Sequence, residues 1–249
     1  MKNLISVIIP FYKKKDYFFK TISSLENQSY KNFEVIIIYD DPDKTDLSHV
    51  IKSLKRIKKK KIIINNKNLG VGLSRNRGIR KSKGSYLAFL DADDIWHKDK
   101  LKKQLKFMKE KKIDFSYTSY QIVNIKNKVV KKIFAPNEIN HRKLLYSCNI
   151  GLSSVMVRHK LLKKNKFKNL KTKEDYLLWL ILSKKKVKML GMNSILLSWK
   201  KTQNSLSSST VQKLQDAYKV YNTYLKFNIL QSIFLTIVLS LNFILKRYL

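Results

Sequence analysis

Three carboxylates follow directly after a short apolar run in the first half of the chain. Residues 86–90 have the length and composition of a buried strand, and Asp91, Asp93 and Asp94 come next. Carboxylates this close in sequence repel one another, so they favour a bound cation, most simply a divalent metal with oxygen ligands. A second interpretation stays open at this point: Asp93 or Asp94 caps a helix that begins near Lys98.

Acidic residues recur at two further places. Asp40 and Asp41 follow an expected strand over residues 33–39, and Glu174 and Asp175 open an expected helix. Taken alone, the first pair also suits an ordinary turn before a proline, and the second pair suits the positive end of a helix dipole. If Asp175 lies near the first acidic group, it could instead act as a general base whose pKa is tuned by burial and by its neighbours.

Strands and helices alternate in the first part of the chain and place these acids at one sheet edge. Apolar, β-branched runs predict strands over residues 4–9, 33–39, 61–64 and 86–90, and helical spacing predicts helices over 16–28, 46–56 and from about 72. This alternation predicts an α/β fold with a mostly parallel central sheet flanked by helices. Ligands of such sheets lie beyond the carboxyl ends of the strands, so we expect the acids to share a crevice with Pro10, Phe11 and Tyr12.

The pattern after about residue 100 is less regular. It predicts a helix over residues 99–111 and short helices over 141–146 and 159–163. It also predicts short strands over residues 113–123 and 129–134, and further strands over 153–157 and 195–199. A Ser-rich loop over residues 205–210 then precedes the last segment. We therefore expect two halves of one domain, residues 1–100 and 101–208, and a C-terminal helical segment, residues 209–249.

Residues 227–245 form the most apolar stretch and predict a C-terminal apolar helix. A helix of this length spans roughly 28 Å, slightly less than a hydrocarbon core of roughly 30 Å. Its polar residues gather on one half of a helical wheel, which favours a helix lying in the membrane interface over one that spans the bilayer. An ordinary helix packed on the globule is the second interpretation and stays open.

Composition limits the classes of protein that the chain can belong to. The 53 Lys and Arg against 17 Asp and Glu give a formal net charge of +36, which favours nucleic acid, acidic lipid headgroups or phosphorylated small molecules as partners. No basic motif interleaved with aromatic residues is present, so sequence-specific nucleic-acid binding is disfavoured. The single cysteine, Cys148, excludes an internal disulfide and fits a reducing compartment. Residues 4–11 lack a cleavage site and indicate a strand, not a signal peptide.

The ordered set of motifs resembles the family 2 glycosyltransferases over residues 4–208. The resemblance lies in five stretches: residues 6–12, 24–37, 68–79, 89–94 and 174–179. It implies a GT-A-type nucleotide-sugar-binding fold, with residues 1–100 as the nucleotide-sugar-binding half and residues 101–208 as the acceptor-binding half. It also implies that Pro10, Tyr12, Asp40, Arg75 and Asp91 bind the nucleotide.

The same resemblance implies a metal site and a catalytic pair. Asp91 and Asp93 would bind a divalent metal, Mn²⁺ or Mg²⁺, with Asp93 the principal ligand. Asp175 would deprotonate the acceptor hydroxyl, and Glu174 would orient it. The chemistry is consistent, because a metal neutralises a diphosphate leaving group while a carboxylate on the opposite face of the sugar activates the nucleophile.

The sequence departs from the family pattern in two places. The turn after Asp40 contains Pro42 where the family usually has glycine, which stiffens it. Thr202 stands where many members carry a histidine, which puts a third protein ligand for the metal in doubt. The processive-synthase motif Gln-x-x-Arg-Trp is absent from the sequence, which argues against a processive polysaccharide synthase.

The expected function is therefore metal-dependent, inverting transfer of a sugar from a nucleoside-diphosphate donor, in the first instance a UDP-sugar. We expect a glycan or lipid-linked glycan acceptor in cell-surface polysaccharide or lipopolysaccharide assembly. The expected location is cytoplasmic and peripheral, at the inner face of the cell membrane and on an anionic lipid surface. The two competing interpretations are a basic nucleic-acid-binding protein and a catalytically inactive glycan-binding relative.

Overall fold

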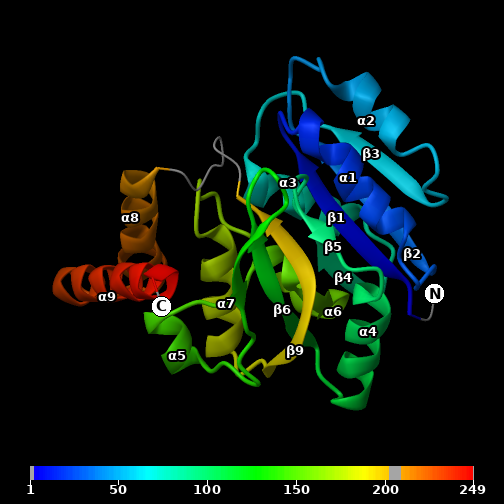
Figure 1. Ribbon diagram of the computed structural model, residues 1–249. Helices are drawn as coiled ribbons and strands as arrows, with labels where there is room; N and C mark the ends of the chain where they lie inside the picture. The colour runs from blue at the N-terminus through cyan, green and yellow to red at the C-terminus, as the bar shows by residue number, and fades with distance from the viewer. Residues whose placement is uncertain (1–2, 202–208, 249) are drawn as a thin grey trace.

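The computed structural model describes residues 3–201 and 209–248 and has a curled central sheet with helices packed on both faces (Figure 1). Its strand order is β3-β2-β1-β4-β8-β6-β9-β5, and β7 pairs with β6 outside this path. The strands are β1 Ile5–Phe11, β2 Phe33–Tyr39, β3 Lys60–Ile64, β4 Tyr86–Phe89, β5 Ile95–Trp96, β6 Phe115–Val123, β7 Val129–Ile133, β8 Met156–Arg158 and β9 Met189–Lys200.

The sheet has a parallel part, formed by the first four strands of the chain, and a mixed part, formed by the other strands. Strands β3, β2, β1 and β4 run parallel, as the alternation of strands and helices predicted. Strand β8 lies antiparallel between β4 and β6, and β7 and β5 are also antiparallel to their neighbours. The long β6 and β9 again pair in parallel. The expectation of a mostly parallel sheet therefore holds for the first four strands but not for the whole sheet.

Side chains on neighbouring strand positions point to opposite faces of the sheet and build two cores. On β1, Ile8 packs in one core while Val7 and Ile9 pack in the other. Helices α1 Lys15–Glu26, α2 Leu47–Ser53 and α4 Lys100–Glu110 cover one face. The other face carries α3 Val71–Lys81, α5 His141–Tyr146, α6 His159–Lys164 and α7 Glu174–Lys184.

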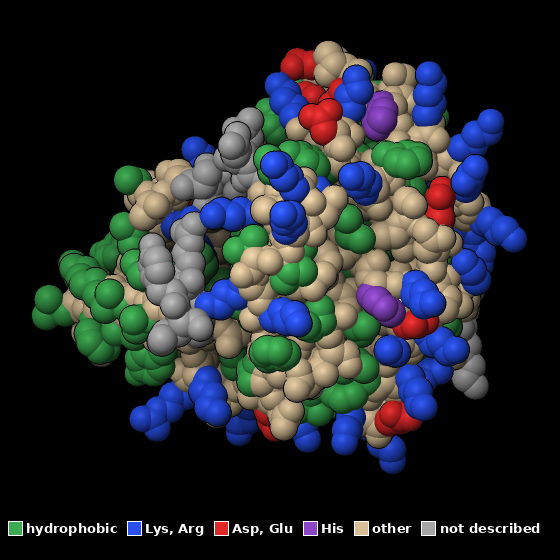
Figure 2. Space-filling view, in the orientation of Figure 1, with side chains coloured by type: hydrophobic (Ala, Val, Ile, Leu, Met, Phe, Trp, Pro, Cys, Tyr) green, Lys and Arg blue, Asp and Glu red, His purple; other side chains and the backbone are tan. Residues whose placement is uncertain are grey.

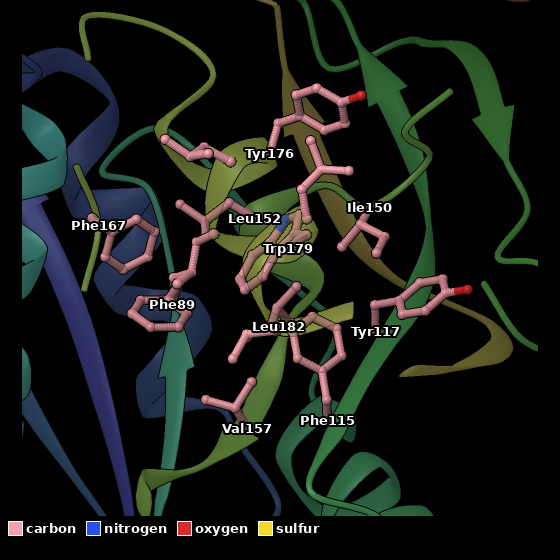
Figure 3. Close-up of a cluster of buried hydrophobic side chains, with 14 of the residues drawn as sticks. Phe89, Phe115, Tyr117, Ile150, Leu152, Val157, Phe167, Tyr176, Trp179 and Leu182 are labelled. Atoms are coloured by element: carbon pink, nitrogen blue, oxygen red, sulfur yellow. The ribbon is translucent and has the colours of Figure 1, made fainter. Parts of the chain in front are cut away.

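Helix α7 is deeply buried in the core that it shares with α3, α5 and α6. Figure 3 shows Trp179 of this helix among Phe115, Phe167 and Leu182. The ring centroids of Trp179 and Phe115 are 4.9 Å apart in an edge-to-face arrangement, a favourable geometry for aromatic pairs. Because α7 is enclosed in this way, the two acids in its first turn have a rigid support.

Several element boundaries differ from those predicted. The predicted strand at residues 153–157 begins with a 3-10 turn, Leu152–Ser154, and only β8 is extended. Strand β9 begins at Met189, well before residue 195, and the two-residue β5 was not predicted. Helix α8, Thr210–Lys219, followed by a π turn over Val220–Tyr224, lies within the helical segment expected over residues 209–249, for which no separate bounds were predicted.

The C-terminal helix α9, Ile229–Tyr248, packs on the protein with a side that combines hydroxyl side chains with Leu235 and Leu239. Ser232 and Thr236 are buried, and their hydroxyls bond to backbone carbonyls one turn earlier in the same helix. Its exposed apolar side chains are Ile229, Leu230, Ile233, Phe234, Ile237, Leu241, Phe243, Ile244 and Leu245. They form the large hydrophobic patch at the left of Figure 2. Among the described residues, no helix has the length and apolar character needed to cross a membrane.

Candidate active site

The three carboxylates after β4 occupy three different environments. Asp94 is fully buried, and its Oδ1 accepts a hydrogen bond of 3.0 Å from the backbone N–H of Lys200 at the end of β9. Asp93 Oδ2 lies 2.8 Å from the Lys14 ammonium. Helix α4 begins after Asp99 and has no side-chain cap. The interpretation of Asp93 or Asp94 as a helix cap is therefore wrong, because one carboxylate ties two strand ends together and the other forms an ion pair.

Burial changes the acidity of these groups. It raises the pKa of Asp94 well above its ordinary value, and the nearby charges of Asp93 and Asp91 act in the same direction. Burial also raises the pKa of Asp93, although the Lys14 ammonium opposes this effect. A concentration of negative charge with raised pKa values is the electrostatic setting that a bound cation relieves.

Arg75 on α3 joins the Asp91 loop to the start of α7. Its side chain is only 3% exposed, its Nη2 lies 2.7 Å from Asp91 Oδ1, and its Nη1 lies 2.5 Å from Glu174 Oε1. Gly72 permits this close approach of α3, because a Cβ there would lie 2.9 Å from the carbonyl oxygen of Lys168. One guanidinium thus holds two carboxylates that are far apart in the sequence.

The two acids at the start of α7 both have raised pKa values. Burial and the neighbouring Asp175 raise the pKa of Glu174 to about 7, while Arg75 works in the opposite direction. Burial also raises the pKa of Asp175, and it is opposed by Arg75 and by the Tyr176 N–H, which donates to Asp175 Oδ1 at 2.7 Å. A carboxylate with a raised pKa is a stronger base than an ordinary aspartate and suits general base catalysis.

Asp40 has a structural role at the end of β2. Its carboxylate accepts hydrogen bonds from Asn65 Nδ2 (2.6 Å), Leu69 N (2.8 Å) and Gly70 N (3.0 Å). Gly70 has a φ of 80°, a conformation that glycine adopts without strain. Asp40 therefore fixes the loop that leads into α3, and this loop positions Arg75.

The remaining residues predicted to bind the nucleotide lie at the ends of β1 and β2. Pro10 is half-buried opposite Ile38, and Tyr12 is 40% exposed. Asp41 follows β2 as well; the sequence placed it at the same crevice, with an ordinary turn as the alternative, and gave it no role of its own. Its side chain is buried, and its Oδ2 has no hydrogen-bond partner among the described residues. Such a group has an unused capacity to accept a hydrogen bond.

A cavity of about 670 Å³ collects much of the predicted site. Arg75, Asp91, Glu174 and Asp175 line it, together with Asp94. Pro10, Tyr12, Asp40 and Asp93 are not among its lining residues. Tyr120, Trp199 and Lys173 line it as well, and only the last of these could have been suspected from sequence, since it directly precedes the two acids of α7.

The family profile described as Glycosyl transferase family 2 matches residues 6–171, which is most of the sheet and the whole Asp91 loop. The chain belongs to this family. The glycosyltransferase is 31% identical to the Bacillus subtilis protein named as the teichuronic acid biosynthesis glycosyltransferase TuaG, over 99% of this chain and 98% of that one. It is 33% identical to the Escherichia coli UDP-Glc:alpha-D-GlcNAc-diphosphoundecaprenol beta-1,3-glucosyltransferase WfgD, over 90% and 87% of the two chains.

A solved structure shows the same fold. The glycosyltransferase superposes on the crystal structure of Staphylococcus aureus TarS residues 1–349 in complex with UDP-GlcNAc with a TM-score of 0.71 and 23% identity. The match covers 88% of this chain and 64% of that one. The GT-A-type fold that the motifs implied is thus confirmed.

Asp91 and Asp93 are the residues of the glycosyltransferase that could hold a divalent metal. Within residues 3–201 and 209–248 there is no group of three or more His, Cys, Asp or Glu side chains that could hold one. Thr202 lies outside the described residues. Asp91 and Asp93 nevertheless provide carboxylate oxygens, and Asp91 shares only one of its oxygens with Arg75. One or two carboxylates combined with substrate phosphates are a normal donor set for Mg²⁺, so the residues fit a metal that arrives with a diphosphate.

Proposed function

We propose that the chain transfers a sugar, with inversion at the anomeric carbon, from a nucleoside-diphosphate donor to a glycan acceptor. The observation that carries this proposal is the placement of Asp91 and Glu174 on one guanidinium, that of Arg75. Asp91, which suits the metal and the diphosphate, and Asp175, which follows Glu174, both line the same cavity. Inverting transfer needs this pair of functions, one for the leaving group and one for the nucleophile.

In the proposed mechanism Asp175 accepts the proton of the acceptor hydroxyl as that oxygen attacks the anomeric carbon. Glu174 keeps its ion pair with Arg75 and so fixes the first turn of α7, which orients Asp175. Asp91 and Asp93 would hold the metal, Mn²⁺ or Mg²⁺, which supplies positive charge to the departing diphosphate when it is bound. The nucleophile and the leaving group then lie on opposite faces of the sugar.

The nucleotide is assigned to the ends of β1 and β2 and to the neighbouring Asp91. Pro10 and Tyr12 present a half-buried ring and an exposed aromatic ring to this edge. Asp40 would act mainly through the loop that it fixes, and Asp41 offers an unused buried carboxylate oxygen to a donor group of the base. A UDP-sugar is the first candidate donor, since one relative is named for UDP-Glc and TarS has been crystallised with UDP-GlcNAc.

The acceptor is proposed to be a lipid-linked glycan of cell-surface polysaccharide or lipopolysaccharide assembly. TuaG and WfgD are named for teichuronic acid and for a diphosphoundecaprenol acceptor, respectively. The exposed apolar side of α9 and the net charge of +36 suit peripheral contact with an anionic membrane from the cytoplasmic side. In this proposal residues 1–100 bind the nucleotide sugar, residues 101–208 bind the acceptor, and residues 209–249 contact the membrane.

A panel of nucleotide sugars tests this function. The full chain is incubated with UDP-, GDP- and dTDP-sugars, with Mn²⁺, with Mg²⁺ or with a chelator, and thermal unfolding and release of the nucleoside diphosphate are measured. We expect one donor class to raise the unfolding temperature and to be hydrolysed slowly only when metal is present. Stabilisation by no donor, or turnover that is unchanged by the chelator, would contradict the proposal.

A further inference from the structure

The catalytic cavity also contains basic side chains that the proposed transfer step does not use. Lys131 on β7, Lys173 before α7, Lys201 after β9 and Lys213 on α8 all line it, together with the acids. Carboxylates attract cations, whereas a set of lysines raises the local concentration of anions. The cavity therefore has the means to bind an anion separately from the metal-binding carboxylates.

Two of these lysines are arranged around one aromatic ring. The Nζ atoms of Lys173 and Lys213 lie 5.9 Å and 5.7 Å from the centroid of Phe243 on α9. Both distances are within the range of a cation–π interaction. Since both Nζ atoms lie within 6 Å of one centroid, the two ammonium groups are close enough in space for one extended anion, such as a diphosphate, to approach both. Lysine is a common phosphate ligand in proteins and acts there as a point charge.

The backbone on either side of these lysines is firmly held. Asp216 on α8 is buried, and its Oδ2 accepts hydrogen bonds from Thr172 N (2.8 Å) and Thr172 Oγ1 (3.0 Å). This clamp fixes α8 to the residue that precedes Lys173. Lys173 itself has a φ of 65°, an uncommon conformation for a residue other than glycine.

Phe243 also belongs to the apolar side of α9. It lines the cavity, and on the outside it continues into Leu241, Ile244 and Leu245, which are exposed. An anion at Lys173 and Lys213 would thus lie where the cavity meets the exposed apolar side of α9. A ligand that fits both features carries phosphate at one end of an apolar chain.

We infer that Lys173 and Lys213, with Phe243, form a subsite for a diphosphate group that is attached to an apolar chain on the acceptor. This inference rests on the proposed function, because it assigns the acceptor-binding part of the same cavity. The diphosphate would be held at the start of α7, next to Asp175, and the chain would leave along α9. The donor diphosphate belongs instead to Asp91 and Asp93, with the metal.

Binding to the full chain, measured by calorimetry in the presence of a chelator, tests this inference. The probes are farnesyl diphosphate, inorganic diphosphate and farnesol. The variant is Lys173→Gln with Lys213→Gln, and the matched control is Lys103→Gln with Lys163→Gln, two exposed lysines on α4 and α6. Lys213→Gln alone replaces the double variant if the latter has a lowered unfolding temperature. Binding of UDP with Mn²⁺ is measured in parallel for each protein.

We expect wild type to bind farnesyl diphosphate more tightly than either of the other probes. The lysine variant should lose roughly tenfold or more of this affinity, since charge-assisted hydrogen bonds are removed, while the control and the binding of UDP stay unchanged. Equal affinity in the variant would overturn the subsite. If wild type binds inorganic diphosphate as tightly as farnesyl diphosphate, the apolar chain is not part of the ligand. If the lysine variant loses UDP binding to the same extent, the two lysines belong to the donor site. Failure of donor hydrolysis in the same preparation would count against the proposed function alone.

Discussion

Nη1 of Arg75 lies 2.5 Å from Oε1 of Glu174, and this ion pair fixes the first turn of α7 to α3. The other terminal nitrogen of the same guanidinium holds Asp91 at 2.7 Å. The guanidinium of Arg75 thus sets the distance between Asp91 and the start of α7, which carries the proposed base Asp175. Catalysis that depends on positioned groups is sensitive to the rigidity of such a link.

Replacing this arginine should destabilise the protein strongly. Arg75→Met leaves two carboxylates without their cation, and removing one partner of a buried ion pair costs about 3–5 kcal/mol. The measurement is the free energy of unfolding from denaturant titration. Arg80→Met, at an exposed position on the same helix, is the control and should change stability little. A loss for Arg75→Met no larger than that of the control would show that the bridge is not structural.

Asp93 should control metal affinity. Asp93→Asn removes a negative oxygen ligand, so we expect the affinity for Mn²⁺ in the presence of UDP to fall about tenfold or more, since changes outside the first coordination shell already cost that much. Paramagnetic resonance of free Mn²⁺ measures the change. Asp43→Asn, on an exposed side chain, is the control. Unchanged Mn²⁺ affinity in Asp93→Asn would remove this residue from the metal site.

The pH dependence of transfer should reflect the raised pKa values of the acids on α7. Glu174 holds the first turn of α7 through its ion pair with Arg75, and its pKa is about 7, while burial raises the pKa of Asp175. Transfer should therefore decline as the pH falls through the region around 7, where Glu174 loses the charge of its ion pair, and decline further as Asp175 is protonated. Two interacting carboxylates titrate as a pair, so the observed value belongs to both.

Glu174→Gln provides the test of that assignment. Glutamine keeps an acceptor for Arg75 but removes one negative charge beside Asp175, so Asp175 should ionise more easily. We expect the acidic limb of the kcat/KM profile to move to lower pH. A limb that stays in place, or that moves to higher pH, would mean that the titrating group is not this pair.

Lys100 should reduce stability at neutral pH. It is fully buried, and burial lowers its pKa to about 7, even though its Nζ lies 4.0 Å from the centroid of the Trp96 ring and donates to Gln104 Oε1. Between pH 7 and the ordinary lysine value of 10.5 the unfolded chain binds more protons than the folded one, so stability rises with pH in this window.

Lys100→Met should remove this pH dependence and raise the unfolding temperature at pH 7. The comparison is with Lys102→Met, an exposed position on the same helix, which should keep the slope of the wild type. Thermal unfolding at several pH values between 7 and 10 measures both effects. A Lys100→Met variant with the slope of the wild type would show that this lysine is not buried as a neutral amine.

The sequence predicted the elements and residues that depend on local pattern. The apolar run before Asp91 and the two acids that open helix α7, Glu174 and Asp175, can each be recognised within a few residues. The structure places Asp91 and these two acids at one cavity. The bridge through Arg75 was not predicted, because its partner Glu174 is 99 residues away and no local pattern encodes that contact. For the same reason Arg75 was expected to bind the nucleotide, a role that stays a prediction beside its two ion pairs.

Other differences also have physical reasons. Strand β8 is three residues long, and β5 is only two, so neither carries a recognisable period. On α9 the helical wheel gathered the polar residues on one half, but it did not show that this half, together with Leu235 and Leu239, packs on the protein. Ser232 and Thr236 can be buried because their hydroxyls bond within the helix, and this leaves the apolar side outward.

The most direct test of the account is the Asp175→Asn variant in a transfer assay with separate measurement of donor binding. Asparagine cannot accept the proton, so transfer should fall by roughly 10²–10⁴-fold, the usual contribution of a general base. Binding of the nucleotide sugar with metal should remain close to that of the wild type, and Glu110→Gln, on an exposed side chain, should leave both unchanged. Transfer by Asp175→Asn at the rate of the wild type would contradict the assignment of the base and, with it, the proposed mechanism.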